Sequence, residues 1–194
     1  MFEIARLCVC SLLCLFFCTC APANAVDRYK IDPTHTLSFF EYSHWGLSLQ
    51  RGRFDRNSGF IELDVENRQG KVEINVDATS VNTANSLFDS ALRSDRFFDA
   101  EQFPIISFKS TQMHFDERGQ VTGIDGELTI KNVTKSVKFE LTHFHCRFMP
   151  LYLSSACGAN GHTKILRSEF DMGRFTPFVS DEVTLYFNVE AIKE

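Results

Sequence analysis

The sequence predicts an all-β protein with about eight antiparallel strands and one short helix. Short runs of alternating apolar and polar residues, separated by turn signals, recur along the chain after residue 25. Strands and helices do not alternate as they do in parallel sheets, so an antiparallel sheet is expected. Residues 31–54 hold a strand with two largely apolar faces, which favours a closed barrel around an apolar interior. A β-sandwich is the competing architecture, and it needs no cavity.

Residues 1–25 have the pattern of a secretory signal peptide. A weakly positive start precedes the apolar run 7–20, and an Ala-Asn-Ala sequence ends at Ala25. The run is too short for a spanning helix, which needs about 20 apolar residues. A lipoprotein signal ending at Cys18 or Cys20 is a further alternative, but the residues before each cysteine suit it poorly. Cleavage after Ala25 leaves residues 26–194 as one exported domain.

Composition narrows the function classes. The net charge is −5 and no basic patch stands out, so nucleic acid is not an expected partner. Outside the predicted signal there are two cysteines, Cys146 and Cys157. In an exported protein they predict a disulfide worth about 3 kcal/mol, with two free buried thiols as the alternative. The 20 phenylalanines, against four tyrosines and one tryptophan, suggest that rings also line an interior space.

The first half of the chain is expected to supply three strands and the helix. The first strand, residues 36–45, carries apolar side chains on both faces. In residues 85–93 apolar side chains recur at three- and four-residue spacing, which predicts an amphipathic helix capped by Thr83 or Asn85. Such a helix suits closure of a core or of a barrel mouth. The other strands expected here are residues 60–64 and 71–81.

The second half is expected to complete the sheet. Residues 121–130 and 136–144 form the clearest predicted hairpin, with Asn132 in its turn. Residues 147–161, which the two cysteines bound, are expected to be irregular. The remaining strands expected are residues 105–113 with Phe115 as an extension, 163–170 and 183–189, and residues 173–181 are expected to form a loop.

No catalytic motif is present: there is no Gly-x-Ser-x-Gly sequence and no phosphate-binding loop. His143 and His145 share one face of a predicted strand and could chelate a metal with His162 or His114. A metal-assisted hydrolase using this pair is therefore the alternative from the enzyme class. An exposed histidine pair is the simpler interpretation, because the spacing fixes no third ligand. We expect no catalysis, no metal and no other cofactor.

Alternation along the strands and spacing in the helix place a set of apolar side chains in the interior. A lumen that removes about 400 Å² of a lipid chain from water contributes on the order of 10 kcal/mol before entropic costs. Periodicity alone does not distinguish such a lumen from a fully packed core. The candidate lining residues are Phe40, Tyr42, Val76, Leu87, Phe88, Leu92, Phe108, Leu128, Ile130, Phe139, Leu141, Leu185 and Phe187.

A series of short motifs, taken in order, resembles the YceI-like, polyisoprenoid-binding periplasmic family. The resemblance runs from about Tyr29 to Ala191, and it rests on the order of many motifs rather than on any one. The motifs are Ile31-Asp32-Pro33-Thr34-His35-Thr36, His44-x-Gly46, Gly52-x-Phe54, Phe97-Phe98-Asp99, Phe103-Pro104, Phe108-x-Ser110, Gly126-x-Leu128-Thr129-Ile130, Arg167-Ser168-x-Phe170 and Val179-Ser180-Asp181-Glu182-Val183.

The resemblance implies a lipocalin-like, eight-stranded, antiparallel up-and-down barrel with a helix near its opening. It also implies a buried long isoprenoid, such as a polyprenyl phosphate or a quinone tail, and no catalytic step. A periplasmic address follows from the same source. Transient contact with a membrane and homodimerisation are both compatible with this picture.

The chain departs from the family pattern at a few positions. Asn132 replaces a turn glycine, and Asp171 replaces a glycine that usually follows Phe170. Ser38 and Tyr42 stand where plain aliphatic residues are common, so one end of the lumen is expected to be more polar. This polarity suggests a ligand with a headgroup, such as a quinone.

The function that these observations favour is a periplasmic carrier or buffer that sequesters an isoprenoid lipid or isoprenoid quinone. A structural or regulatory periplasmic domain, with a core filled by its own side chains, is the alternative. The two differ in whether a cavity exists.

Overall fold

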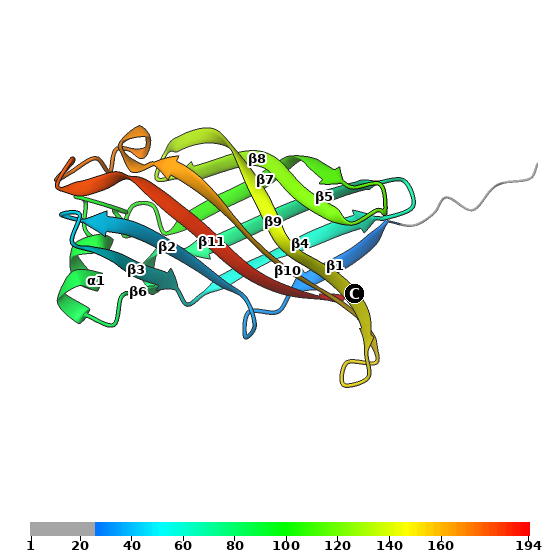
Figure 1. Cartoon of the computed structure of the whole chain (residues 1–194). Helices are drawn as coiled ribbons and strands as arrows, with labels where there is room; N and C mark the ends of the chain where they lie inside the picture. Colours follow the sequence, from blue (N-terminus) through cyan, green and yellow to red (C-terminus); the bar gives the residue numbers. More distant parts are fainter. Residues whose placement is uncertain (1–25) are drawn as a thin grey trace, which may run out of the picture.

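The computed structural model describes residues 26–194, so the predicted signal peptide lies outside the described residues. Eight strands form a closed ring in the order β1-β4-β5-β7-β8-β9-β10-β11, and every neighbouring pair is antiparallel (Figure 1). Tyr29 closes the ring, because it pairs with Ile61 on one side and Lys193 on the other. These strands are β1 (Asp27–Ile31), β4 (Asn57–Asp64), β5 (Gln69–Asp77), β7 (Ile105–Phe115), β8 (Val121–Ile130), β9 (Val133–Met149), β10 (Ser154–Leu166) and β11 (Val179–Lys193).

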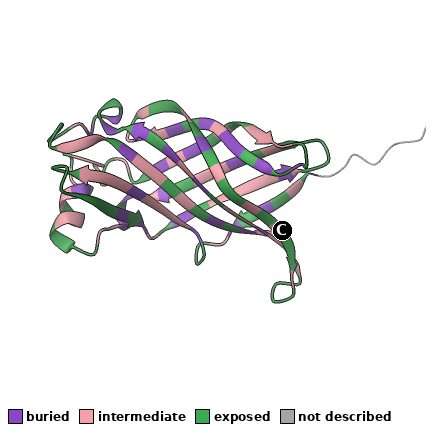
Figure 2. Ribbon diagram, in the orientation of Figure 1, coloured by how far each residue is buried: buried purple, intermediate pink, exposed green. Residues whose placement is uncertain are grey.

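Three further strands extend the wall at one end of the barrel. They are β2 (Leu37–His44), β3 (Ser48–Phe54) and β6 (Val81–Asn82). The long strand β11 pairs with β1 near its C-terminal end and with β2 along the rest of its length. Buried residues alternate with exposed ones along the strands, as a barrel with an apolar interior requires (Figure 2).

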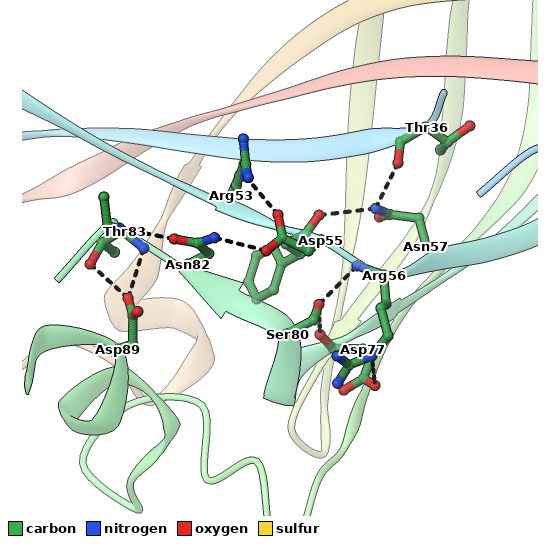
Figure 3. Close-up of polar contacts among 12 residues, drawn as sticks. Thr36, Arg53, Asp55, Arg56, Asn57, Asp77, Ser80, Asn82, Thr83 and Asp89 are labelled. Carbon is green, nitrogen blue, oxygen red and sulfur yellow. Dashed lines mark hydrogen bonds and ion pairs between the residues drawn. The ribbon is translucent and has the colours of Figure 1, made fainter. Parts of the chain in front are cut away.

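Buried polar side chains bond to the backbone where the partner of β11 changes from β1 to β2. Thr36 is 1% exposed, and its hydroxyl donates to the Glu190 carbonyl and accepts from the Glu190 amide, both at 3.2 Å. Asn57, also buried, donates to the carbonyls of Thr36 and Phe54 at 3.2 and 3.1 Å (Figure 3). Ser38 donates to the Asn57 amide oxygen at 2.7 Å. These bonds satisfy backbone groups that the splitting sheet leaves without strand partners.

Helix α1 (Ser86–Arg93) lies at the end of the barrel where β2 ends (Figure 1). Asn85 caps it, with its side-chain oxygen accepting from the amides of Leu87 and Phe88. The carboxylate of Asp89 accepts from both the amide and the hydroxyl of Thr83 at 2.7 Å, which fixes the entry into the helix (Figure 3). The predicted helix and one of its two predicted caps are confirmed.

The predicted closed, eight-stranded, antiparallel barrel with one helix is confirmed. Strand 121–130 has the predicted bounds, and strand 105–113 runs through Phe115. Strands β1 and β3 were not predicted from the sequence. The predicted strand 163–170 ends at Leu166, where a 3₁₀ helix (Arg167–Phe170) begins.

The largest correction concerns residues 147–161. They are not irregular, since β9 reaches Met149, β10 begins at Ser154, and a short turn joins them. Small residues such as Ser155, Gly158 and Gly161 lower β-propensity in this segment. Pairing with a strand on each side outweighs that weakness, because β10 is hydrogen-bonded along its length to both β9 and β11.

Two departures from the family pattern concern backbone conformation. Asp171 has φ 56° and ψ 33°, so it adopts the left-handed conformation that a glycine would adopt without strain. In the β8–β9 turn the left-handed residue is Lys131, with φ 57°, rather than Asn132. Asp, unlike a β-branched residue, tolerates this region, which explains how the chain keeps the same turn without the glycine.

Candidate ligand-binding cavity

The barrel encloses a cavity of ≈ 830 Å³ that opens at one end. This volume falls within the range of small-molecule sites, about 300–1,000 Å³. Its wall comes from the inner faces of the strands and from one face of α1, and most of its side chains are aliphatic or aromatic. The lining side chains away from the opening include Phe40, Phe54, Ile61, Val72, Ile74, Val76, Phe98, Ile106, Phe108, Ile124, Leu128, Ile130, Phe139, Ile165, Val183, Leu185, Phe187 and Val189.

Two groups of aromatic rings lie in this wall. Near α1, the ring of Phe54 lies 5.8 Å from Phe40 and 5.3 Å from Phe98 between centroids. In a second group, Phe139 lies 5.2 Å from Phe108 and 5.4 Å from Phe187, both edge to face. These geometries are favourable for aromatic pairs, so the rings within each group support one another.

Glycines on neighbouring strands let several of these rings lie close to the wall. A Cβ atom at Gly126 would lie 2.5 Å from Cζ of Phe108, and one at Gly161 would lie 2.7 Å from Cζ of Phe187. Gly52 stands directly across from Phe40 in the β2–β3 pair and lies beneath its ring in the same way. Any side chain at these positions would push a ring toward the lumen, so the glycines contribute to the width of the cavity.

Three segments supply exposed residues to one end of the cavity: the β2–β3 turn, the stretch after α1, and the loop before β11. Trp45 stacks on Phe178 at 4.5 Å between ring centroids, and the Trp45 amide donates to the Phe178 carbonyl. The rings of Phe97, after α1, and Phe175, in the loop before β11, lie 6.4 Å apart between centroids, so these two segments are also in contact. This end is the mouth, and its exposed lining residues are His44, Trp45, Gln50, Arg96, Arg174, Phe175 and Phe178.

The family model of the YceI-like domain matches residues 29–191. The chain belongs to the YceI family. Protein YceI of Escherichia coli O157:H7 is 31% identical over 175 residues, which cover 89% of this chain and 90% of that protein. A UPF0312 protein of Vibrio campbellii is 30% identical with the same coverage of both chains. The resemblance inferred from the ordered motifs is therefore confirmed.

Solved structures share the fold of this YceI-family chain. The YCEI protein of Campylobacter jejuni has a TM-score of 0.66 and 26% identity, covering 78% of this chain and 90% of its own. Burkholderia cenocepacia BcnA has a TM-score of 0.69 at 20% identity, with 82% and 98% covered. A polyisoprenoid-binding domain from Saccharophagus degradans, implicated in plant cell wall breakdown, has a TM-score of 0.64 at 15% identity, with 86% and 98% covered.

Eleven of the thirteen predicted lining residues border the cavity of this YceI-family protein. Leu87 does not, and it is 83% exposed. The inward stripe of α1 is Phe88, Ala91 and Leu92, and Leu87 precedes it by one position, about 100° around the helix. The prediction for Leu87 is therefore wrong, because the helix spacing admitted two neighbouring stripes.

Leu141 is the second exception. It is partly buried against the core but does not border the cavity. It directly precedes the point where β9 slips register against β10, between Asn160 and Gly161. A bulge shifts the alternation of the residues that follow it, so Leu141 still faces the core and Phe144 is the next residue to do so.

Sequence reasoning missed the lining residues that come from irregular segments. Phe97, Phe98 and Met172 lie outside strands and helices, where side chains follow no period that a sequence pattern could reveal. The clustering of aromatic residues in these segments could have indicated lining residues. Phe97 and Phe98 are adjacent in a non-strand segment, and Phe175 and Phe178 flank Pro177. Phe54 also lines the cavity, and it was missed because β3 was not predicted.

The mouth end is the polar end of the cavity. Burial raises the pKa of the Tyr42 phenol, and the positive charge of Arg167 acts in the opposite direction. No protein hydrogen bond to the Tyr42 hydroxyl is found within residues 26–194, whereas the Ser38 hydroxyl is already bonded to Asn57. Of the two polar positions that the sequence singled out, Tyr42 therefore offers a donor toward the lumen.

Arg167 borders the cavity, but its guanidinium donates its hydrogen bonds to the loop before β11 and to the start of β11. Burial lowers the pKa of its guanidinium, and the charges of Asp181 and Tyr42 act in the opposite direction. Its Nε donates to the Ser180 carbonyl at 2.8 Å, and its Nη2 donates to the Val179 carbonyl at 2.9 Å. The remaining donors reach the carbonyls of Met172 and Arg174 and the hydroxyl of Thr176. The side chain thus fastens the loop that carries the mouth aromatics.

The histidines that were considered for a metal lie on the outside of the barrel. His143 and His145 are exposed, with ring centroids 6.5 Å apart. The proposed third ligand His114 is instead 2.8 Å from Asp125. Within residues 26–194, no group of three His, Cys, Asp or Glu side chains could hold a metal ion. The geometry thus lends no support to the metal-assisted hydrolase.

The predicted disulfide between Cys146 and Cys157 is confirmed. The two residues face each other in the β9–β10 pair, so the bond joins two strands that are already neighbours. Among the described residues, no helix has the length and apolar character needed to cross a membrane.

Proposed function

We propose that this protein binds a long isoprenoid lipid in the barrel cavity and carries or buffers it in the periplasm, with no catalytic step. The observation that carries the proposal is the apolar cavity of ≈ 830 Å³ with one open end. Burial of an apolar chain there is favourable at about 25 cal/mol per Å² removed from water. The predicted signal peptide supports the periplasmic address, and residues 26–194 would act as a single lipid-binding domain.

The fold of a known lipid binder supports the class of ligand. The Saccharophagus degradans protein of this fold is a polyisoprenoid-binding domain, which supports an isoprenoid as the ligand of this barrel. The alternative of a structural domain needs a core filled by its own side chains, and the cavity argues against it.

The test is native mass spectrometry of the purified protein, followed by organic extraction of whatever it carries. A discrete added mass that resolves into a polyprenyl or quinone species is expected. A protein that stays free of lipid after incubation with polyprenyl phosphate and with ubiquinone would contradict the proposal.

Two variants of α1 make this experiment specific to the cavity. Ala91 borders the cavity, whereas the neighbouring Ser90 is exposed on the outer face. Ala91→Phe adds a ring inside the lumen and is expected to abolish the lipid adduct. Ser90→Phe adds the same ring on the outside and is expected to retain it. Equal lipid content in the two variants would place the lipid outside the barrel.

The ligand that we propose has a polar headgroup near the mouth. Tyr42 borders the cavity with a hydroxyl that has no hydrogen-bond partner within residues 26–194, so it can donate to a quinone carbonyl. Tyr42→Phe removes this donor and keeps the ring. The expected result is a loss of preference for ubiquinone over an uncharged polyprenol, by roughly five- to ten-fold for one hydrogen bond. An unchanged preference in competition binding would count against the headgroup contact.

A further inference from the structure

We propose that the mouth of the cavity docks on the surface of an anionic phospholipid bilayer. The docking surface consists of the β2–β3 turn with Leu49, Leu87 of α1, the mouth aromatics Phe175 and Phe178, and the arginines Arg96 and Arg174. The inference rests on the proposed function, because a lipid that enters an apolar lumen must leave a membrane through this opening.

Three aromatic side chains belong both to the cavity and to the outer surface. Trp45, Phe175 and Phe178 line the cavity, and they are 57%, 54% and 55% exposed. They form a continuous path from the lumen to solvent, since Trp45 is stacked on Phe178. Tryptophan is enriched at the membrane interface, where its ring contacts the acyl region and its N–H meets water.

Exposed leucines surround the same end of the barrel. Leu47 and Leu49, from the β2–β3 turn and the start of β3, are 85% and 63% exposed. Leu87, on α1 at the same end (Figure 1), is 83% exposed. Exposed apolar side chains that gather around an opening mark an interaction surface rather than ordinary surface variation. The exposure of Leu87, which excludes it from the lumen, is thus explained by the docking surface.

The charges at the mouth select a negatively charged partner. Among residues 26–194, neither Arg96 nor Arg174 forms an ion pair with a carboxylate, and both border the opening. Residues 44–50 and 172–180 contain no Asp or Glu, and in the mouth segment after α1 the exposed Asp95 precedes Arg96. The protein as a whole carries a net charge of −5, which would repel an anionic bilayer elsewhere on its surface. Unpaired arginines at the opening therefore orient the mouth toward such a bilayer.

A second copy of the chain fits this surface less well. Two mouths that face each other across a two-fold axis would bring Arg174 of both copies into one interface, and residues 172–180 supply no carboxylate to compensate them. Like charges at an interface are unfavourable. A bilayer supplies acyl chains for the aromatic and leucine side chains and phosphates for the arginines.

Trp45 provides a direct readout, because it is the only tryptophan of the chain. Vesicles of equal parts phosphatidylethanolamine and phosphatidylglycerol are expected to shift Trp45 emission to shorter wavelength and to carry the protein in flotation. Brominated acyl chains are expected to quench the emission. Phosphatidylcholine vesicles, or raised salt, are expected to weaken binding, because charge attraction is then lost or screened. Absence of both flotation and a spectral shift on the anionic vesicles would overturn the proposal.

Matched variants locate the surface. Leu47→Gln with Leu49→Gln removes apolar side chains that do not line the cavity, and binding to the anionic vesicles is expected to fall about ten-fold or more. The control is Leu151→Gln with Leu153→Gln, in the β9–β10 turn at the opposite end of the barrel, where the leucines are 81% and 82% exposed (Figure 1). The control is expected to bind like the parent. An equal loss in the control would overturn docking through the mouth.

The failure of docking and the failure of lipid binding are separable. Lipid that is still extracted from the Leu47/Leu49 variant, with vesicle binding lost, supports docking as a distinct property. A parent protein that binds vesicles but carries no isoprenoid overturns the proposed function and leaves docking in place. A change of sedimentation coefficient in this variant without vesicles would show that the surface joins two copies, which overturns the bilayer as its partner.

Discussion

At the scale of single residues, buried polar groups decide where the barrel wall divides. Thr36 and Asn57 are 1% and 3% exposed, and their side chains bond to backbone groups of Glu190, Thr36 and Phe54. The Glu190 carbonyl also accepts from the Asp32 amide, so an apolar replacement of Asn57 is expected to cost more than one of Thr36, at about 1–3 kcal/mol for each buried carbonyl left unpaired. These residues are therefore structural, although a buried Thr and Asn beside an apolar lumen resemble binding residues.

The turn between β1 and β2 yields a pH-dependent prediction. Burial raises the pKa of Asp32, but hydrogen bonds from His35 and Thr34 outweigh it and hold that pKa below 3.8. The same hydrogen bond to Asp32, at 2.7 Å from the His35 Nδ1 atom, raises the pKa of His35 above 6.5. The contribution of protonated His35 is therefore complete below pH 6.5 and is lost as pH rises through its raised pKa. The contribution of Asp32 is present above pH 3.8 and is lost as pH falls below it.

We expect His35→Gln to lower the melting temperature at pH 5.5 and to lower it less at pH 8, because the parent loses the charged pair as pH rises. Melting curves of both proteins at the two pH values measure this. The control is His143→Gln, another exposed histidine, for which no ion pair with a carboxylate is found within residues 26–194. A gap between parent and His35→Gln that widens toward pH 8 would contradict the assignment.

At the scale of elements, pairs of a glycine and an aromatic ring shape the lumen. The three atoms nearest to a Cβ at Gly52 all belong to the ring of Phe40, so Ala at this position displaces the ring and not the backbone. Phe40 lines the cavity, so a ring displaced from Gly52 is expected to change the shape of the lumen.

Gly52→Ala is therefore expected to weaken binding of ubiquinone by roughly ten-fold or more and to destabilise the fold by about 1–3 kcal/mol, as an overpacked core does. The matched control is Gly158→Ala on β10, where the nearest atom to a Cβ would be 3.9 Å away. Binding titrations and denaturant unfolding separate the two effects. Unaltered ubiquinone binding in Gly52→Ala would show that Phe40 does not limit the lumen.

The same elements show which parts of the fold a sequence reveals. Strand β8 and helix α1 were predicted nearly to the residue, because apolar side chains recur at strand spacing from Ile124 to Ile130 and at helix spacing in α1. Strand β3 was missed, since Ser48, Gln50 and Arg51 give it a polar pattern that only pairing with β2 makes a strand. The β9–β10 hairpin was missed because its small residues have weak preferences. Both segments become strands because they pair with other strands of the sheet, and a local sequence pattern does not reveal such pairing.

The cavity was predictable to a similar degree and for the same reason. Lining residues on regular strands follow from alternation, and Phe108, Phe139 and Phe187, which it placed inward, border the cavity. Alternation also places Leu141 inward, where it packs against the core without bordering the cavity, and helix spacing did not exclude Leu87. That the interior is hollow rather than filled depends on where rings meet glycines of other strands, and those contacts exist only in the folded barrel.

At the scale of the whole molecule, a closed barrel around a large apolar cavity is incomplete without its ligand. Atoms that line an empty space lack packing partners on one side, and a ligand that binds only the folded state stabilises it by mass action. A free lipid concentration of about a hundred times the dissociation constant stabilises the folded protein by about 2.7 kcal/mol. The stability of this protein is therefore expected to depend on what it carries.

Extraction of lipid from the folded protein is expected to lower its melting temperature by about 5–10 °C, and addition of ubiquinone in detergent is expected to restore it. Ala91→Phe places a ring in the lumen, so its melting temperature is expected to change little on either treatment. Ser90→Phe, with the ring outside, is expected to behave like the parent. Identical melting before and after extraction in the parent would mean that the cavity is not where the lipid resides, whatever lipid the protein carries. A response in the parent that Ala91→Phe removes ties stability, cavity and ligand to the same interior space.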